Sequence, residues 1–218
     1  MSTATEGSIA AEVDRVVGEL RTAVPSWVAT GLDERIALLE ELAQSILEAA
    51  DGWTIAAAQA KGIRRDSPAM AEDWGSGVLA TLRNVTLLAA TLRDIRDTGR
   101  PAPPSIRMDD RGHTVVDVFP SDVVDRALFP GFTAEVRLAA GVTPEQARER
   151  MGRIHHEGHV SPPEVSLVLG AGNVSSIGPM DALTQLFAED RVVLLKLNPV
   201  NDYLAPHLEV ALRPLIRG

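Results

Sequence analysis

Two short, predominantly apolar runs in the C-terminal quarter of the sequence constrain the fold most strongly. They are Val165–Leu169 (VSLVL) and Arg191–Leu197 (RVVLLKL), and short runs of this kind are typical of strands buried on both faces of a parallel sheet. Between them, apolar residues recur at helical spacing: Ile177, Met180, Leu183, Leu186 and Phe187. The pattern predicts a strand, a crossover helix and a parallel strand, followed by a helix over residues 202–216.

The first hundred residues have helical spacing. Between residues 32 and 50, one helical face carries Ile36, Leu39, Ala43, Ile46 and Ala50. Asp33 is the expected N-cap of this helix. A further helix is predicted from Ser67, with an interruption at Gly75–Gly77 and an end near Asp97.

The middle of the chain changes to strand spacing. Residues His113–Phe119 and Phe132–Leu138 are predicted strands, and Asp109–Gly112 (DDRG) is a predicted hairpin turn. Thr143–Gln146 (TPEQ) is a capping box that predicts a helix over Pro144–His156. The histidines of His155–His159 are expected at a solvated helix end rather than in a metal site, because Gly158 interrupts their spacing.

These patterns predict the α/β class in three segments. Residues 1–100 form a helical N-terminal layer, residues 101–163 a small β-hairpin region with a helix, and residues 164–218 the first βαβα unit of a nucleotide-binding sheet. Two parallel strands have too little surface to form a domain, and a nucleotide-binding sheet normally takes two such halves. Either the β-rich middle completes the sheet or further chain does, and we favour the second, so that all three segments belong to one incomplete cofactor-binding domain.

Composition excludes several classes of protein. The net charge of −9 argues against a nucleic-acid surface, and no apolar run approaches the roughly 18 residues of a membrane helix. The N-terminal residues MSTATEGS lack the basic and apolar regions of a signal peptide, so a cytoplasmic protein is expected. The chain contains no cysteine, which rules out disulfides, thiolate metal sites and a cysteine nucleophile within it.

The turn after the first apolar run reads GAGN, which begins like a dinucleotide-binding fingerprint. Gly170 and Gly172 match G-x-G-x-x-G, but Ser175 occupies the third glycine position. The glycines serve either a close approach to a ligand or a tight turn with positive φ. Lys196 ends the second apolar run, at the edge of a parallel sheet where ligands of α/β proteins bind.

Residues Glu164–Pro199 resemble the first part of the cofactor domain in the aldehyde dehydrogenase superfamily, on the branch near acyl-CoA and fatty-acid reductases. Asn173 closes the first turn and Lys196 ends the second strand, 23 positions later, which is the offset expected for that family. In the family, this asparagine helps to stabilise the oxyanion formed by thiolate attack, and the lysine contacts the adenosine ribose. Gly172 replaces the family's tryptophan and Pro199 its ribose-binding glutamate, which leaves the choice between NAD and NADP open.

The resemblance implies an oxidoreductase: the N-terminal fragment of an NAD(P)-dependent aldehyde or acyl dehydrogenase. It implies Asn173 as the catalytic residue, a small aldehyde or acyl substrate, homo-oligomerisation, and a cofactor, NAD or NADP, bound by Gly170, Ala171, Gly172, Lys196 and Asn198. Without a cysteine, the chain alone is expected to be inactive. The alternative, which the missing cysteine favours, is a non-catalytic helical and α/β interaction or regulatory module.

Overall fold

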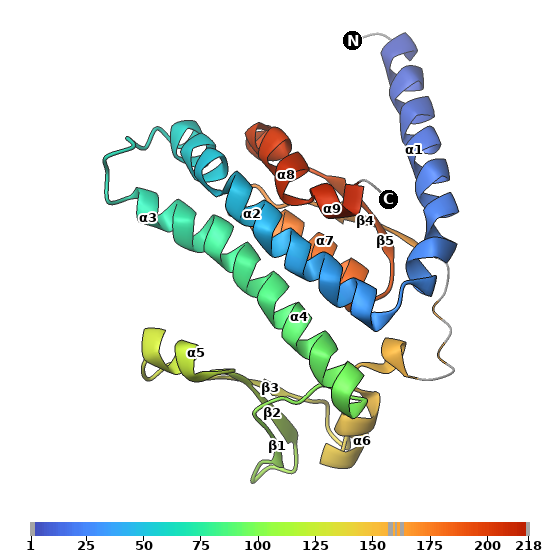
Figure 1. The fold of residues 1–218 in the computed structure, drawn as a ribbon, viewed down its shortest axis with the longest axis vertical. Coiled ribbons are helices and arrows are strands. Elements are labelled where there is room, and N and C mark those ends of the chain that lie inside the picture. The colour runs from blue at the N-terminus through green and yellow to red at the C-terminus, as the bar shows by residue number, and fades with distance from the viewer. Residues whose placement is uncertain (1–2, 157–158, 160, 162–163, 217–218) are drawn as a thin grey trace. The chain divides into compact units, whose positions relative to one another are not determined.

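The computed structural model describes residues 3–156, 159, 161 and 164–216, and it shows a mixed α/β fold (Figure 1). The chain forms two compact units, one from residues 1–92 together with 160–218 and the other from residues 93–159. The N-terminal helices and the C-terminal parallel strands, assigned to separate segments on sequence grounds, therefore share one unit. No helix in the described part of the chain is both long and apolar enough to cross a membrane.

The first unit is built from helices around a parallel strand pair. Strands β4 (Val165–Leu169) and β5 (Val192–Lys196) pair from Val165 opposite Val192 to Leu169 opposite Lys196, and α7 (Ile177–Phe187) connects them. This confirms the predicted strand, helix and strand. The remaining helical elements of this unit are α1 (Thr3–Ala29), α2 (Leu32–Ala60), α3 (Met70–Asp73), η1 (Trp74–Leu79), most of α4 (Ala80–Thr98), η3 (Pro199–Leu204), α8 (Ala205–Ala211) and α9 (Arg213–Ile216).

Helix α2 runs through the core of the first unit. Ile36, Leu39, Ile46 and Ala50 of the predicted apolar face are buried and Ala43 is half-buried, which confirms this face. Leu42 and Trp53 are completely buried as well. The expectation that Asp33 caps this helix was wrong, because the N-cap is Gly31. The Glu34 carboxylate accepts the Gly31 N–H at 3.3 Å, so an acidic side chain in the first turn satisfies the free end of the helix.

The predicted interruption at Gly75–Gly77 was also wrong, since the chain is helical from Met70 to Thr98. The π-helical segment η1 (Trp74–Leu79) contains the glycines. A glycine inside a helix costs roughly 1 kcal/mol relative to alanine, which a tertiary contact can offset. Gly77 makes such a contact with α2, described below.

Strand β4 is buried on one face only, which corrects the prediction of strands covered on both faces. Val168 is 7% exposed, whereas Leu167 and Leu169 are 60% and 67% exposed. Successive side chains point to opposite faces of a strand. One face of β4 is therefore left uncovered by the residues that the structure describes.

The second unit contains an antiparallel sheet in the order β1 (Ser105–Met108), β2 (Thr114–Phe119), β3 (Ala134–Arg137). Its helices, apart from the last turns of α4, are α5 (Val123–Leu128), α6 (Pro144–Arg150) and the 3₁₀ turn η2 (Arg153–His155). Within the described residues, its three strands pair only with one another, so the β-rich middle does not complete the parallel sheet.

Local sequence signals in the second unit were mostly correct. The Asp109–Gly112 turn joins β1 and β2, with Gly112 at a φ of 77°. The TPEQ capping box is present, with the Gln146 N–H donating to the Thr143 hydroxyl at 3.2 Å. Helix α6 ends at Arg150, before the predicted His156, because Gly152 takes a left-handed φ of 64°.

Candidate functional site

The predicted site residues lie on two loops at the carboxyl ends of β4 and β5. The first loop carries Gly170, Ala171, Gly172 and Asn173, and the second follows Lys196. The Gly170 N–H donates to the Lys196 carbonyl oxygen at 2.9 Å, which joins the loops directly. The structure therefore brings the GAGN turn and the end of β5 to one edge of the sheet, where ligands of parallel sheets bind.

Close packing explains both glycines of the GAGN turn, and positive φ does not, because neither takes a left-handed conformation. A Cβ atom on Gly170 would lie 3.3 Å from the Lys196 carbonyl oxygen. One on Gly172 would lie 2.7 Å from a Val200 methyl carbon and 3.0 Å from Asn198 Cγ. Both glycines thus allow the two loops to approach each other.

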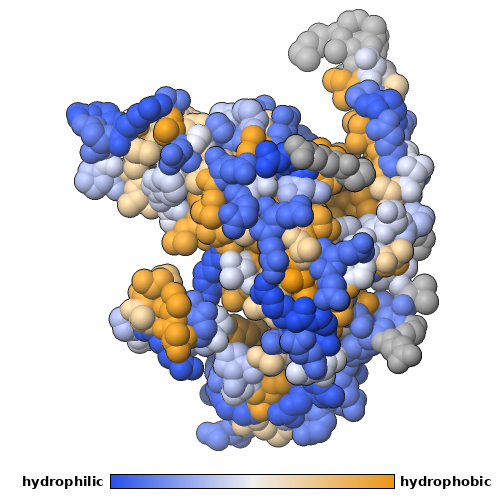
Figure 2. Space-filling view, viewed as in Figure 1, coloured by the Kyte–Doolittle hydropathy of each residue, from blue (hydrophilic) through white to orange (hydrophobic). Residues whose placement is uncertain are grey.

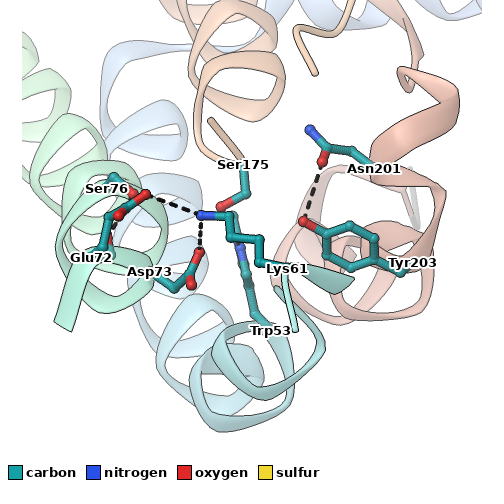
Figure 3. Close-up of polar contacts among 8 residues, drawn as sticks. All are labelled: Trp53, Lys61, Glu72, Asp73, Ser76, Ser175, Asn201 and Tyr203. Carbon is teal, nitrogen blue, oxygen red and sulfur yellow. Dashed lines mark hydrogen bonds and ion pairs between the residues drawn. The ribbon is translucent and has the colours of Figure 1, made fainter. Parts of the chain in front are cut away.

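Asn201 and Tyr203, both on η3, hold the GAGN turn from the side of the second loop. The Asn201 Nδ2 group donates to the Ala171 carbonyl oxygen at 2.9 Å, and the side chain is 6% exposed. Tyr203 donates its hydroxyl to Asn201 Oδ1 at 3.2 Å, as Figure 3 shows. The buried amide therefore has a partner on each side, which orients it against the turn.

Helix α2 holds the other end of the same loop. Trp53, fully buried, donates its indole N–H to the Ser175 hydroxyl at 3.0 Å (Figure 3). A Cβ atom on Gly77 would lie 2.7 Å from this hydroxyl and 3.2 Å from the indole nitrogen, so only glycine leaves room for the bond. Ser176 occupies the N-cap position of α7, but its side chain makes no capping bond.

Some of the predicted ligand-binding side chains are free of partners within the described chain, and one already forms a hydrogen bond. Asn173 and Lys196 are exposed, and neither side chain has a hydrogen-bond or ion-pair partner among the residues described. The Asn198 Oδ1 atom instead accepts the Val200 N–H at 3.1 Å and caps η3. Asn198 thus has a local structural task, and only its NH₂ group remains for a ligand.

An ion pair at the C-terminal end of α2 lies close enough to Tyr203 for its charges to affect the pKa of the phenol. Lys61 Nζ is 2.7 Å from Asp73 Oδ1 and 3.3 Å from Glu72 Oε1 (Figure 3). The hydrogen bond to the Asp73 carboxylate is the main cause that raises the pKa of Lys61. Burial is the main cause that raises the pKa of the Tyr203 phenol; the Lys61 charge opposes this effect and the Asp73 charge adds to it.

These two shifts predict a loss of stability at alkaline pH. Lys61 and Tyr203 keep their protons to higher pH in the folded protein than in the unfolded chain, where they titrate at about 10 to 10.5. We expect the urea midpoint to be insensitive to both groups below about pH 9.5 and to fall as the pH rises through their folded pKa values. Tyr203 is the only tyrosine, so its ionisation can be followed by ultraviolet absorbance. A Tyr203 titration at or below the ordinary tyrosine pKa would contradict this prediction.

An apolar hollow of the first unit is lined by none of the residues of the GAGN turn. This cavity of about 610 Å³ lies among α1, α7, β5, α8 and α9, and its lining includes Trp27, Leu183, Leu195 and Leu212. None of the predicted site residues lines it. Within the described ranges, no group of three or more histidine, aspartate or glutamate side chains is placed to hold a metal ion.

Sequence reasoning missed most of the residues that support the GAGN turn. Trp53, Asn201 and Tyr203 belong to no sequence motif, although their side chains form these hydrogen bonds. The available signal was positional, since polar residues directly after a predicted parallel strand lie at the ligand-binding edge. Comparison with protein-family models, with curated proteins and with solved structures found no match.

Proposed function

We propose that the loops after β4 and β5 form one side of a nicotinamide cofactor site, in a protein of the aldehyde dehydrogenase type with an atypical Rossmann sheet. The observation that carries the proposal is the exposure of Asn173 and Lys196 at the same edge of a β4–α7–β5 unit. Gly170, Ala171 and Gly172 are fixed between them by hydrogen bonding and close packing. A fixed loop is what a binding site needs, because little conformational freedom is lost on binding.

The residues present fit a nicotinamide dinucleotide. Lys196 is an exposed cation with no ion-pair partner in the described chain, suited to ribose hydroxyls or to a 2′-phosphate. The Asn198 NH₂ group is a second donor beside it. NAD and NADP both match this donor set, and the bound cofactor would supply hydride transfer.

Asn173 would serve a different step from Lys196. Its exposed side-chain NH₂ group can donate to the oxyanion that develops when a thiolate attacks an aldehyde or acyl carbonyl. Removing one such donor typically lowers kcat by about 10²–10³-fold. The thiolate itself cannot come from these 218 residues, which contain no cysteine, so the proposal assigns cofactor binding to this chain and turnover to an assembly that supplies the nucleophile.

Calorimetric titration with NAD and with NADP tests the proposal. We expect measurable binding of at least one cofactor and a roughly 10- to 100-fold weaker affinity in Lys196→Ala, the effect of removing a charged hydrogen-bond donor. The matched control is Arg191→Gln, which removes one positive charge at the opposite end of β5, where Arg191 pairs with Glu164 at 2.9 Å. Equal losses in the two variants would show that only overall charge matters.

The competing function is the non-catalytic interaction or regulatory module. The missing cysteine favours it, and so does the exposed apolar surface on β4. It predicts no affinity for either cofactor in a folded, stable protein. The same titration separates the two functions, because binding that Lys196→Ala abolishes is incompatible with the module.

A further inference from the structure

We propose that β3 is a self-association strand that pairs antiparallel with β3 of a second copy of this chain, around a two-fold axis through Val136. Strand β3 is at the edge of its sheet, and all four of its residues are exposed. In the described part of the chain, no other strand pairs with its outer side. An edge strand presents unpaired N–H and C=O groups that can accept a further strand.

The hydrogen bonding within the sheet shows which backbone groups face outward. The Leu138 N–H donates to the Thr114 carbonyl oxygen at 2.8 Å, and Val136 lies opposite Val116. In an antiparallel ladder, every second residue directs its N–H and C=O toward the same neighbouring strand. The backbone groups of Glu135 and Arg137 therefore point away from β2, toward the free edge.

Charge then selects one register for a symmetric pair. Three two-fold registers place outward-facing residues opposite one another. Two of them set Glu135 against Glu135 or Arg137 against Arg137, and like charges directly opposite are destabilising. The third sets Glu135 of each copy against Arg137 of the other, twice by symmetry, with Val136 meeting Val136 between them. The strand is thus complementary to itself, which a two-fold interface requires.

Apolar surface beside β3 adds area to such an interface. Figure 2 shows hydrophobic residues gathered over α5. The large apolar residues that are more than 40% exposed on α5, β3 and the neighbouring segments are Val118, Val123, Val124, Leu128, Phe129, Phe132 and Val136. Apolar side chains gathered on a surface in this way, as over α5, mark an interaction site. Phe129 links this surface to the sheet, because its ring lies 5.7 Å from that of Phe119, which is opposite Ala134 of β3.

Charge reversal measured by sedimentation velocity tests the proposal. We expect the wild-type protein to form dimers with a Kd on the order of 10 µM, in the range of small interfaces. Glu135→Arg alone and Arg137→Glu alone should each weaken dimerisation by about tenfold or more, because each places like charges opposite one another at two symmetric positions. The double variant Glu135→Arg/Arg137→Glu should restore the wild-type Kd.

The double variant also separates the role of these two charges in dimerisation from a role in ion pairs within one chain. Glu135 lies 2.6 Å from Arg107, and Arg137 lies 3.3 Å from Asp109. Arg137 also lies 3.7 Å from Glu135, and this internal pair keeps opposite charges in the double variant. The double reversal creates like charges in the pairs with Arg107 and Asp109, so a role confined to those two pairs predicts that it is the worst of the three variants. Circular dichroism confirms that each variant is folded. A wild-type protein that stays monomeric to about 100 µM, well above the expected Kd, would overturn the proposal, as would a double variant no tighter than the single ones.

Discussion

Replacing Arg35 with methionine should lower the free energy of unfolding by about 3–5 kcal/mol. The Arg35 guanidinium lies 2.5 Å from Asp190 Oδ1, and the two side chains are only 3% and 6% exposed. It also donates to the carbonyl oxygens of Trp27 and Thr30, at 2.9 and 3.0 Å. The substitution leaves a buried, uncompensated carboxylate at Asp190 and releases the end of α1. Urea denaturation followed by circular dichroism measures the loss.

A double-variant cycle tests whether this buried pair is the cause. Asp190 has a φ of 57°, a conformation that asparagine tolerates, so Asp190→Asn removes the charge without backbone strain. Arg35→Met/Asp190→Asn should be more stable than the sum of the single losses predicts, because neither charge remains unpaired. Arg64→Met provides the exposed comparison, since Arg64 and Asp66 form an ion pair with side chains 81% and 70% exposed. Equal losses in Arg35→Met and Arg64→Met would refute the explanation.

Truncating Trp53 to alanine should cost about 3–5 kcal/mol and loosen the GAGN loop. The indole is completely buried, and among the described residues it alone forms a hydrogen bond with the Ser175 hydroxyl. The substitution leaves a cavity in the core beside α2. It also removes the hydrogen bond to Ser175, which lies just before the start of α7. Chemical denaturation gives the stability change, and amide hydrogen exchange over residues 170–177 reports the loop.

Two variants separate the packing of Trp53 from its hydrogen bond. Trp74→Ala removes the same side chain from a site that is 40% exposed and should cost much less. Ser175→Ala removes the bond but keeps the indole in place, and should cost only about 1–3 kcal/mol. If amide hydrogen exchange in the loop is faster in Ser175→Ala while most of the stability is kept, the Trp53–Ser175 hydrogen bond serves to position the loop. Unchanged exchange in both Trp53→Ala and Ser175→Ala would contradict a supporting role.

The sequence predicted the secondary structure better than it predicted the residues that support the candidate site. Strand β4 agrees with its predicted bounds, and the capping box at Thr143 starts α6 as expected. These features depend on residues close together in the chain. The supports of the GAGN turn were not predictable in this way, because Trp53 and Ser175 are 122 positions apart and no local pattern links them.

The features that the sequence determined by itself depend on interactions between residues close together in the chain. Apolar periodicity, turn glycines and capping side chains act within a few residues, so they specified the β4–α7–β5 order and the β1–β2 turn at Asp109–Gly112. Tertiary packing decided the rest. Gly75–Gly77 stayed helical because Gly77 fits against Trp53, and Leu167 and Leu169 are exposed because no described element covers that face of β4. The role of a glycine, or the burial of a strand, depends on which distant segment packs against it. The free energy of that packing is not determined by the residues next to it in the sequence.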